Sequence, residues 1–385
     1  MDSQDTLPAA YRPLFPWFGG KRQIAAEVWR GIGADIANYV EPFFGSGAVL
    51  FLRPGPPSIE TINDADGMVA NFWRAVQREP EAVAEHADNP VNECDLHARH
   101  LWLVGQRERI ADELCGNPDY YDAKAAGWWC WGLCCWIGGG WCSGNGPWQS
   151  IDGVMTLGDA GRGVKRQLPH LGDAGRGVNR QLPHLGNAGQ GVNRQLPHLR
   201  GAGQGVNRKL PHLGGAGQGV NRKLPHLGDA GQDRRAWLLA EIRRFADRLR
   251  NVRVCCGDWS RVCGVAPTVR QGITGVFLDP PYADTADRDP HLYSTDSLSI
   301  AHDVREWAIA HGRDKRMRIV LAGYDGEHAM PGDWRVVAWK ARGGYGNQGD
   351  GNINATRERL WLSPHCLAGN AAHRTRSLFE ENLHA

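Results

Sequence analysis

Short apolar runs alternate with segments of helical spacing along most of the chain, and this pattern predicts an α/β fold. Mostly apolar runs bounded by glycine, proline or aspartate are typical of buried parallel strands. The clearest run is Gly275–Leu278, because two prolines follow it almost at once and cannot continue a strand. Predicted strands lie at residues 36–44, 58–62, 252–256, 275–278 and 318–322, with a final hairpin formed by 334–340 and 358–362.

Helices are predicted where apolar residues recur three or four positions apart. The segment 123–137 is apolar all round, which indicates a buried helix too short to cross a bilayer. No longer apolar run and no N-terminal leader pattern is present, so we expect a cytoplasmic protein of a bacterial host cell that does not enter a membrane. The predicted helices occupy residues 23–30, 48–52, 67–77, 96–114, 123–137, 233–251 and 300–311.

A strand, a glycine loop and a helix open the fold, in the order typical of a nucleotide-binding unit. The loop reads Glu41-Pro42-Phe43-Phe44-Gly45-Ser46-Gly47, and the second strand ends at Asp64, where a carboxylate can take ribose hydroxyls. The third glycine of a dinucleotide fingerprint is missing, so a pyrophosphate has no evident cradle. The pattern favours an adenosine-bearing cofactor without phosphates, such as S-adenosylmethionine.

The strand 275–278 ends in Asp279-Pro280-Pro281-Tyr282, at the edge where open α/β sheets bind their ligands. This turn presents a carboxylate, carbonyls that only accept hydrogen bonds, and an aromatic ring. Acceptors beside a flat ring suit a planar substrate that carries an amino group, and a nucleobase is such a substrate.

Together these motifs resemble those of the D12-class DNA adenine-N6 methyltransferases, in which the cofactor motifs precede the catalytic one. The resemblance rests on Phe18-Gly19-Gly20-Lys21, the loop 41–47, Asp64 and the turn 279–282, in that order. It implies a Rossmann-like methyltransferase sheet with helices on both faces, and methyl transfer from S-adenosylmethionine to N6 of an adenine flipped out of duplex DNA. The implied catalytic residues are Asp279, Pro280 and Tyr282, and the implied cofactor-binding residues are Trp17, Lys21, Glu41, Phe43, Gly45, Gly47, Asp64, Asp258 and Asp279.

Three other functions stay open at this point. N4-cytosine methylation uses similar chemistry, although such enzymes more often carry Ser in place of Asp279. A second alternative is that the substrate is RNA and not DNA. A catalytically silent DNA-binding protein is the third alternative, and the intact Asp279 and cofactor loops argue against it.

The catalytic domain is predicted to be discontinuous, with an inserted helical recognition subdomain and a repeat insertion. In the related enzymes target recognition lies between the cofactor and catalytic motifs. Trp141 and Trp148 fall in that segment, where they either pack in the core or contact DNA, and Lys340, Arg342 and Arg357 suit DNA phosphates. The predicted divisions are 14–115 with 233–365 (catalytic), 116–156 (recognition), 157–232 (repeats), and the tails 1–13 and 366–385.

A 14-residue unit repeats from Leu157, with five full copies that end at His170, His184, His198, His212 and His226. Each copy has few sizeable apolar residues, so one interpretation is a flexible or weakly ordered insertion. The alternative is a stack of short units whose arginines track DNA. Residues 151–232 carry 11 Lys and Arg against 4 Asp, although the whole chain has a net charge of only +2.

No metal site and no disulfide framework are expected. The ten cysteines include two adjacent pairs, and neither their spacing nor the periodic histidines match a common zinc pattern. The expected partner is double-stranded DNA, bound by a monomer. The repeats suggest a phage-type, solitary methylase without a partner endonuclease.

Overall fold

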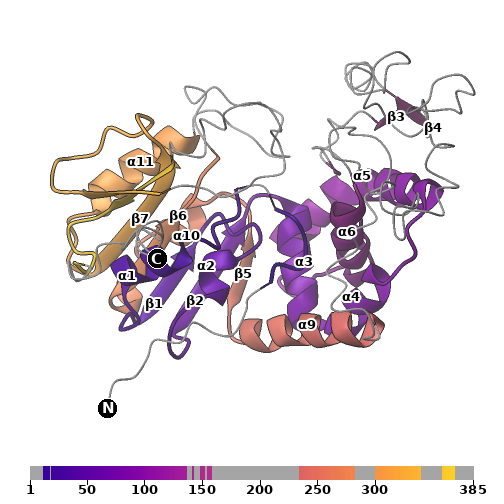
Figure 1. Cartoon of the computed structure of the whole chain (residues 1–385), viewed down its shortest axis with the longest axis horizontal. Helices are drawn as coiled ribbons and strands as arrows, with labels where there is room; N and C mark the ends of the chain where they lie inside the picture. Colours follow the sequence, from indigo (N-terminus) through magenta and orange to yellow (C-terminus); the bar gives the residue numbers. More distant parts are fainter. Residues whose placement is uncertain are drawn as a thin grey trace, which may run out of the picture.

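The computed structural model describes residues 12–17, 19–136, 141–142, 148–151, 154–157, 234–281, 300–339 and 358–368. Figure 1 shows a sheet with helices packed on it and a second group of helices beyond one sheet edge. Within these ranges, no helix is both long enough and apolar enough to pass through a membrane. The predicted repeats and both predicted tails lie wholly or mostly outside the described residues.

The main sheet has seven strands, five of them parallel, as the apolar runs predict. β9 runs antiparallel to β7, and β8 runs antiparallel to β9, so the predicted C-terminal hairpin is confirmed. β1 is shorter than its apolar run, because Pro42 follows it and has no N–H for the ladder. From one edge to the other, the strands are β5 (Arg253–Cys256), β2 (Ile59–Asp64), β1 (Asn38–Glu41), β6 (Thr274–Leu278), β7 (Met317–Tyr324), β9 (Glu358–Leu362) and β8 (Arg335–Ala338).

The helices confirm the predicted ones, with ends shifted by a few residues, and add α4 and the short helices α10 and η4, which the sequence analysis did not predict. α4 begins with a proline, which is favourable in the first turn, but it has only eight residues. A small β3–β4 hairpin was not predicted either. The remaining elements are α1 (Ala25–Ile32), α2 (Ala48–Phe51), α3 (Gly67–Arg78), α4 (Pro80–Ala87), α5 (Glu93–Gly116), α6 (Ala123–Cys135), β3 (Trp148–Ile151), β4 (Val154–Leu157), α9 (Arg234–Leu249), α10 (Ser260–Cys263), the 3₁₀ helix η4 (Val269–Gln271) and α11 (Ile300–His311).

Alternate side chains of β6 enter the cores on the two faces of the sheet. Val276 and Leu278 pack with α10 and α11, whereas Phe277 belongs to the larger core on the α1 face. Gly275 also faces α1, and a Cβ on it would overlap Ile32, so glycine allows the close approach of helix and strand. Both faces are therefore buried, as expected of a parallel sheet covered by helices.

Strands from the two ends of the chain interleave. The β1–β2 pair lies between β5 and β6, both of which come later in the sequence than the recognition and repeat segments. α9 secures the junction from outside the sheet: the Arg248 guanidinium lies 2.6 Å from Glu60 of β2, and Arg53 binds the same carboxylate at 2.8 Å. Glu60 is only 1% exposed, so this carboxylate is compensated by two arginines where burial would otherwise be costly.

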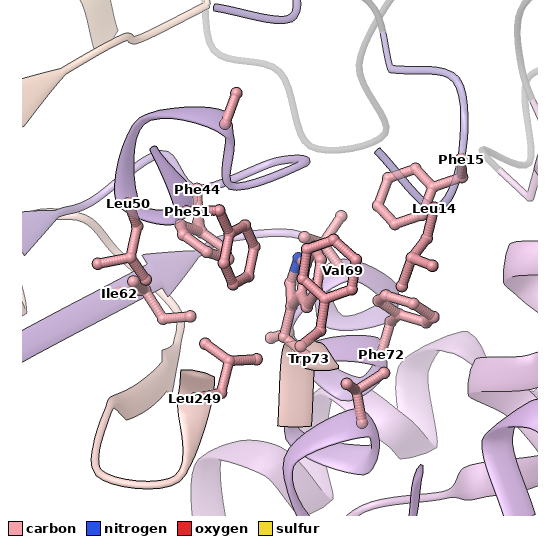
Figure 2. Packing of buried hydrophobic residues seen from close by; sticks show 14 of the residues in the cluster. Leu14, Phe15, Phe44, Leu50, Phe51, Ile62, Val69, Phe72, Trp73 and Leu249 are labelled. Atoms are coloured by element: carbon pink, nitrogen blue, oxygen red, sulfur yellow. The ribbon is translucent and has the colours of Figure 1, made fainter. Parts of the chain in front are cut away.

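A cluster of aromatic side chains fills the space between α2, α3 and α9 (Figure 2). The ring centroids of Phe44 and Phe51 lie 5.4 and 5.2 Å from that of Trp73, and Leu249 of α9 packs in the same cluster. The Trp73 indole N–H donates to the Gly45 carbonyl at 2.8 Å. The hydrophobic core thus holds the glycine loop after β1 in a defined position.

Candidate active site

Loops that follow β5, β2, β1 and β6 meet at the carboxyl edge of the sheet. Asn63 joins three of them, because its side-chain amide donates to the carbonyls of Pro42 (3.1 Å) and Gly257 (2.9 Å) from the end of β2. The Gly257 N–H in turn donates to the Asp64 carbonyl at 3.1 Å. Open α/β sheets bind ligands at this edge, and of the predicted residues Glu41, Asp64, Asp258 and Asp279 follow or end these strands.

Two glycines give the loop after β1 its shape. Gly45 and Gly47 have φ angles of +49° and +74°, in the left-handed region that L side chains rarely adopt. A Cβ on Gly45 would also overlap the indole of Trp17, so the backbone passes close beneath that ring. Trp17 and the glycine loop, both predicted cofactor-binding elements, are therefore in direct contact.

Asp64 bridges the glycine loop and the start of α3. Its two carboxylate oxygens accept N–H bonds from Gly45 and Asp66, each at 2.9 Å. Burial raises the pKa of Asp64 to about 7, although these N–H bonds act in the opposite direction. Each oxygen has a second lone pair, so the carboxylate can still accept a ribose hydroxyl while it shapes the loop.

Glu41, the last residue of β1, is a buried acid at the base of the site. It is 2% exposed, and it accepts a hydrogen bond from the Tyr39 hydroxyl at 2.9 Å. Burial raises the pKa of Glu41 well above its usual value, and the nearby negative charge of Asp279 adds to this effect. Tyr39 was not predicted as a site residue. It lies two residues before Glu41 in β1, and an aromatic residue at that place in a strand is equally typical of a core side chain.

Asp279 forms an ion pair with Lys21, which the sequence analysis assigned to the cofactor. The Lys21 ammonium lies 2.9 Å from Asp279 Oδ1 and donates to the Gly19 carbonyl at 3.1 Å. Burial raises the pKa of Asp279, and the positive charge of Lys21 opposes this rise. Burial lowers the pKa of Lys21, but attraction to Asp279 and to Glu358 outweighs it, so the net change is upward. The lysine thus binds the predicted catalytic carboxylate in this structure.

Asp258 lies at the mouth of the site, at the end of β5. Its exposed carboxylate accepts bonds from the backbone N–H and the hydroxyl of Ser260, which opens α10. The next residue, Trp259, was not predicted, yet its ring stacks near Phe43 at a centroid distance of 6.3 Å. Trp307 of α11 contacts the Trp259 ring edge-on at 6.2 Å. An aromatic residue directly after a predicted adenine-binding acid was the signal available in the sequence.

Trp141 takes the core-packing alternative. It is 8% exposed, its indole N–H donates to the Trp129 carbonyl at 3.1 Å, and its ring packs beside His100 and Trp136. A Cβ on Gly132 of α6 would overlap this ring, so the helix surface is shaped to receive it. In this structure the Trp141 ring therefore packs in the core, whereas the alternative, contact with DNA, stays a prediction.

Some predicted site residues cannot be placed. Pro280 is buried directly after β6, but Tyr282, Lys340, Arg342 and Arg357 lie outside the described residues. Trp148 opens β3, whose backbone pairs with β4, and its side chain is not described. Within the described ranges, no group of three or more His, Cys, Asp or Glu side chains is arranged to hold a metal ion.

A comparison with family models matched residues 17–100 to the D12 class N6 adenine-specific DNA methyltransferases. The match includes Trp17, Lys21, the loop 41–47 and Asp64, and it ends before Asp258 and Asp279. No curated protein matched the chain. Members of this family methylate adenine in DNA with S-adenosylmethionine as methyl donor, and the seven-stranded, mostly parallel sheet agrees with that chemistry. Residues 17–100 thus form part of a D12 class N6 adenine-specific DNA methyltransferase domain.

Proposed function

We propose that the chain transfers a methyl group from S-adenosylmethionine to N6 of an adenine flipped out of duplex DNA, with Asp279 as the catalytic carboxylate. The observation that carries this proposal is the 2.9 Å ion pair between Lys21 and Asp279. Lys21 lies inside the matched family segment, whereas Asp279 lies far outside it. The pair therefore connects the matched segment to the Asp279-Pro280-Pro281 turn at one edge of one sheet.

The residues at this edge fit a cationic adenosine cofactor. Four acids, Glu41, Asp64, Asp258 and Asp279, lie at this edge, and Lys21 forms an ion pair with Asp279. The carboxylates that are ionised there would attract a sulfonium and repel a pyrophosphate. Glu41 and the 45–47 loop would hold the methionine part, Asp64 the ribose, and Asp258 with the rings of Phe43 and Trp259 the adenine. When bound, the cofactor supplies a methyl group on a positively charged sulfur, which leaves as a neutral thioether.

The chain's own task is to make the adenine amino group nucleophilic. Asp279 Oδ2 and the Pro280 carbonyl would accept the two N6–H bonds, since Lys21 already occupies Oδ1. These bonds favour electron density on nitrogen as it becomes tetrahedral. The proton that nitrogen loses can then reside on Asp279, whose pKa burial raises. We assign Tyr282 to π contact with the flipped ring, because N6 cannot be reached inside the base stack.

We infer the domain organisation from the same placement. Residues 14–115 and 233–365 form the catalytic domain, residues 116–156 the recognition segment, and residues 157–232 an insertion. In support, α6 packs against α3 and α4 beside the sheet, and the β3–β4 hairpin follows it directly. We propose that this segment contacts duplex DNA, and that the enzyme acts as a solitary monomer. Lys340, Arg342 and Arg357 are the proposed phosphate contacts.

The test is to incubate the protein with methyl-labelled S-adenosylmethionine and unmethylated duplex DNA, then to digest the DNA to nucleosides. We expect label in N6-methyldeoxyadenosine. Label in N4-methylcytosine would change the target base, label only with RNA would change the substrate, and cofactor binding without transfer would support a silent DNA-binding protein.

The residue assignment is tested with Asp279→Ala. We expect label transfer to disappear while cofactor binding, measured by calorimetry, is retained. Asp314→Asn removes a half-buried carboxylate that pairs with Arg316 at the opposite end of the sheet, and it serves as the control, with wild-type turnover expected. Substantial turnover by Asp279→Ala would exclude the proposed role.

A further inference from the structure

A second buried acid, Glu358, lies at the same edge of the sheet as Lys21 and Asp279, and its charge raises the pKa of Lys21. Glu358 is 6% exposed and opens β9, where it pairs across the sheet with Tyr324, the last residue of β7. Because β9 is antiparallel to β7, its first residue lies at the carboxyl edge of the sheet, on the same side as Asp279. Glu358 therefore lies at the active-site edge although the strand that carries it runs in the opposite direction.

Burial of the Lys21 ammonium explains why a second negative charge near it is favourable. The ammonium is 5% exposed, so its loss of hydration must be offset by nearby negative groups and hydrogen bonds. Asp279 contributes most of the attraction, Glu358 follows, and the Tyr324 phenol contributes less. The charge of Asp279 also raises the pKa of Glu41 of β1. Lys21 is thus drawn toward two acids, one that would contact substrate and one that would not.

We propose that Glu358 is a positioning residue, which holds the Lys21 ammonium from the β9 side and thereby keeps Asp279 oriented and ionised for the adenine amino group. This proposal rests on the proposed function and adds a residue to that site. Glu358 would touch neither substrate nor cofactor. Its carboxylate acts through Lys21, because Lys21 is the cation that binds Asp279 directly.

The test compares Glu358→Gln with Glu327→Gln. Glu327 is a suitable control. It is 9% exposed, it lies just after β7, the strand that pairs with β9, and it accepts a hydrogen bond from the backbone N–H of Tyr324 at 2.7 Å. Unlike Glu358, it is not among the groups that shift the pKa of Lys21. Both changes remove one negative charge and keep the side-chain size. Single-turnover methyl transfer is measured against pH for each variant, together with the KM values for cofactor and DNA.

We expect Glu358→Gln to lower kcat about 10- to 100-fold, since misplacement of a catalytic group has effects of this size. Its acidic limb should move to higher pH, while both KM values stay near those of the wild type. Glu358→Asp, which keeps the charge, should restore part of kcat. A Glu358→Gln profile identical to that of Glu327→Gln would overturn the proposal.

A readout independent of turnover separates this proposal from the proposed function. The Lys21 side chain is titrated by NMR in lysine-labelled protein, with Lys21→Arg used to assign the signal. Its midpoint should be lower in Glu358→Gln than in the wild type and unchanged in Glu327→Gln. If Glu358→Gln does not fold, as judged by circular dichroism, Glu358→Asp must shift the midpoint in the same direction by less. An unchanged midpoint would overturn the role of Glu358 even in an active enzyme, whereas an inactive wild type with the expected midpoints would refute only the proposed function.

Discussion

Lys21→Met isolates the effect of the Lys21 ammonium on the ionisation of Asp279, the proposed catalytic carboxylate. Methionine keeps most of the length and the apolar contacts of lysine but removes the charge 2.9 Å from Asp279. At an effective dielectric constant of about 20, opposite charges at this distance attract by about 6 kcal/mol before desolvation is counted. Removal of one partner from a buried pair costs about 3–5 kcal/mol in practice.

The cost of Lys21→Met should depend on pH with a definite sign. Burial already holds the folded-state pKa of Asp279 above its unfolded value, and loss of Lys21 raises it further. Between those two pKa values the folded protein binds a proton that the unfolded chain has released. The free energy of unfolding of Lys21→Met should therefore decrease as pH rises through that window, and more steeply than that of the wild type.

Two assays check this prediction. Urea unfolding across the pH range measures the stability difference, and single-turnover methyl transfer measures the ionised fraction of Asp279. We expect Lys21→Met to lose most turnover at neutral pH and to regain part of it in alkaline buffer. Arg22→Met removes the exposed neighbouring cation and should leave the acidic limb unchanged. If the acidic limbs of Lys21→Met and wild type coincide, Lys21 does not control the ionisation of Asp279 and the reasoning fails.

Two further predictions concern the cofactor loop. Gly45→Ala should destabilise the fold by about 1–3 kcal/mol and weaken cofactor binding at least tenfold in calorimetry, because residue 45 has a positive φ and a Cβ there would overlap the Trp17 ring. The control Gly105→Ala, whose Cβ would lie in open space on α5, should be neutral or stabilising. Normal cofactor binding by Gly45→Ala would contradict the role assigned to this loop. The affinity of the wild type for the cofactor should fall as pH decreases through about 7, where Asp64 takes up a proton. Asp64→Asn should bind the cofactor weakly, and its affinity should not depend on pH in this range. If the wild-type affinity does not change between pH 5 and pH 8, the role of Asp64 is refuted. Because the folded-state pKa of Asp64 is raised, its contribution to stability is favourable at low pH and is lost as pH rises toward 7, so denaturation at pH 5 and 8 gives an independent check.

Local chemistry made most of the sheet readable from the sequence. Apolar runs of strand length gave the seven strands, since parallel strands are buried on both faces and need little alternation. The glycines at 45 and 47 were informative for the same reason, because few other residues adopt their backbone angles. α4 was missed, since it has only eight residues and two of its three buried side chains are small alanines.

Contacts between residues far apart in the sequence could not be predicted in this way. Lys21 follows two glycines near the start of the chain, and nothing local indicates that it binds Asp279 rather than a ligand. Trp141 follows three glycines, a context that is equally typical of a loop at a surface, and only the tertiary fold places it against Gly132. Glu358 begins a strand whose next residue is Arg359, and its burial depends on the antiparallel direction of β9.

The interleaved sheet has a consequence for how the chain is completed during synthesis. When the ribosome has synthesised β1 and β2, both outer edges of that pair are still unpaired, because β5 and β6 have not yet been made. Two open edges on an apolar pair are a site for wrong pairing with other chains. Every extra copy of the 14-residue unit lengthens that exposure, because it delays the strands that seal the edges. The number of repeats therefore sets how long the edges of β1 and β2 stay unpaired during synthesis, whatever the repeats contribute to the finished enzyme.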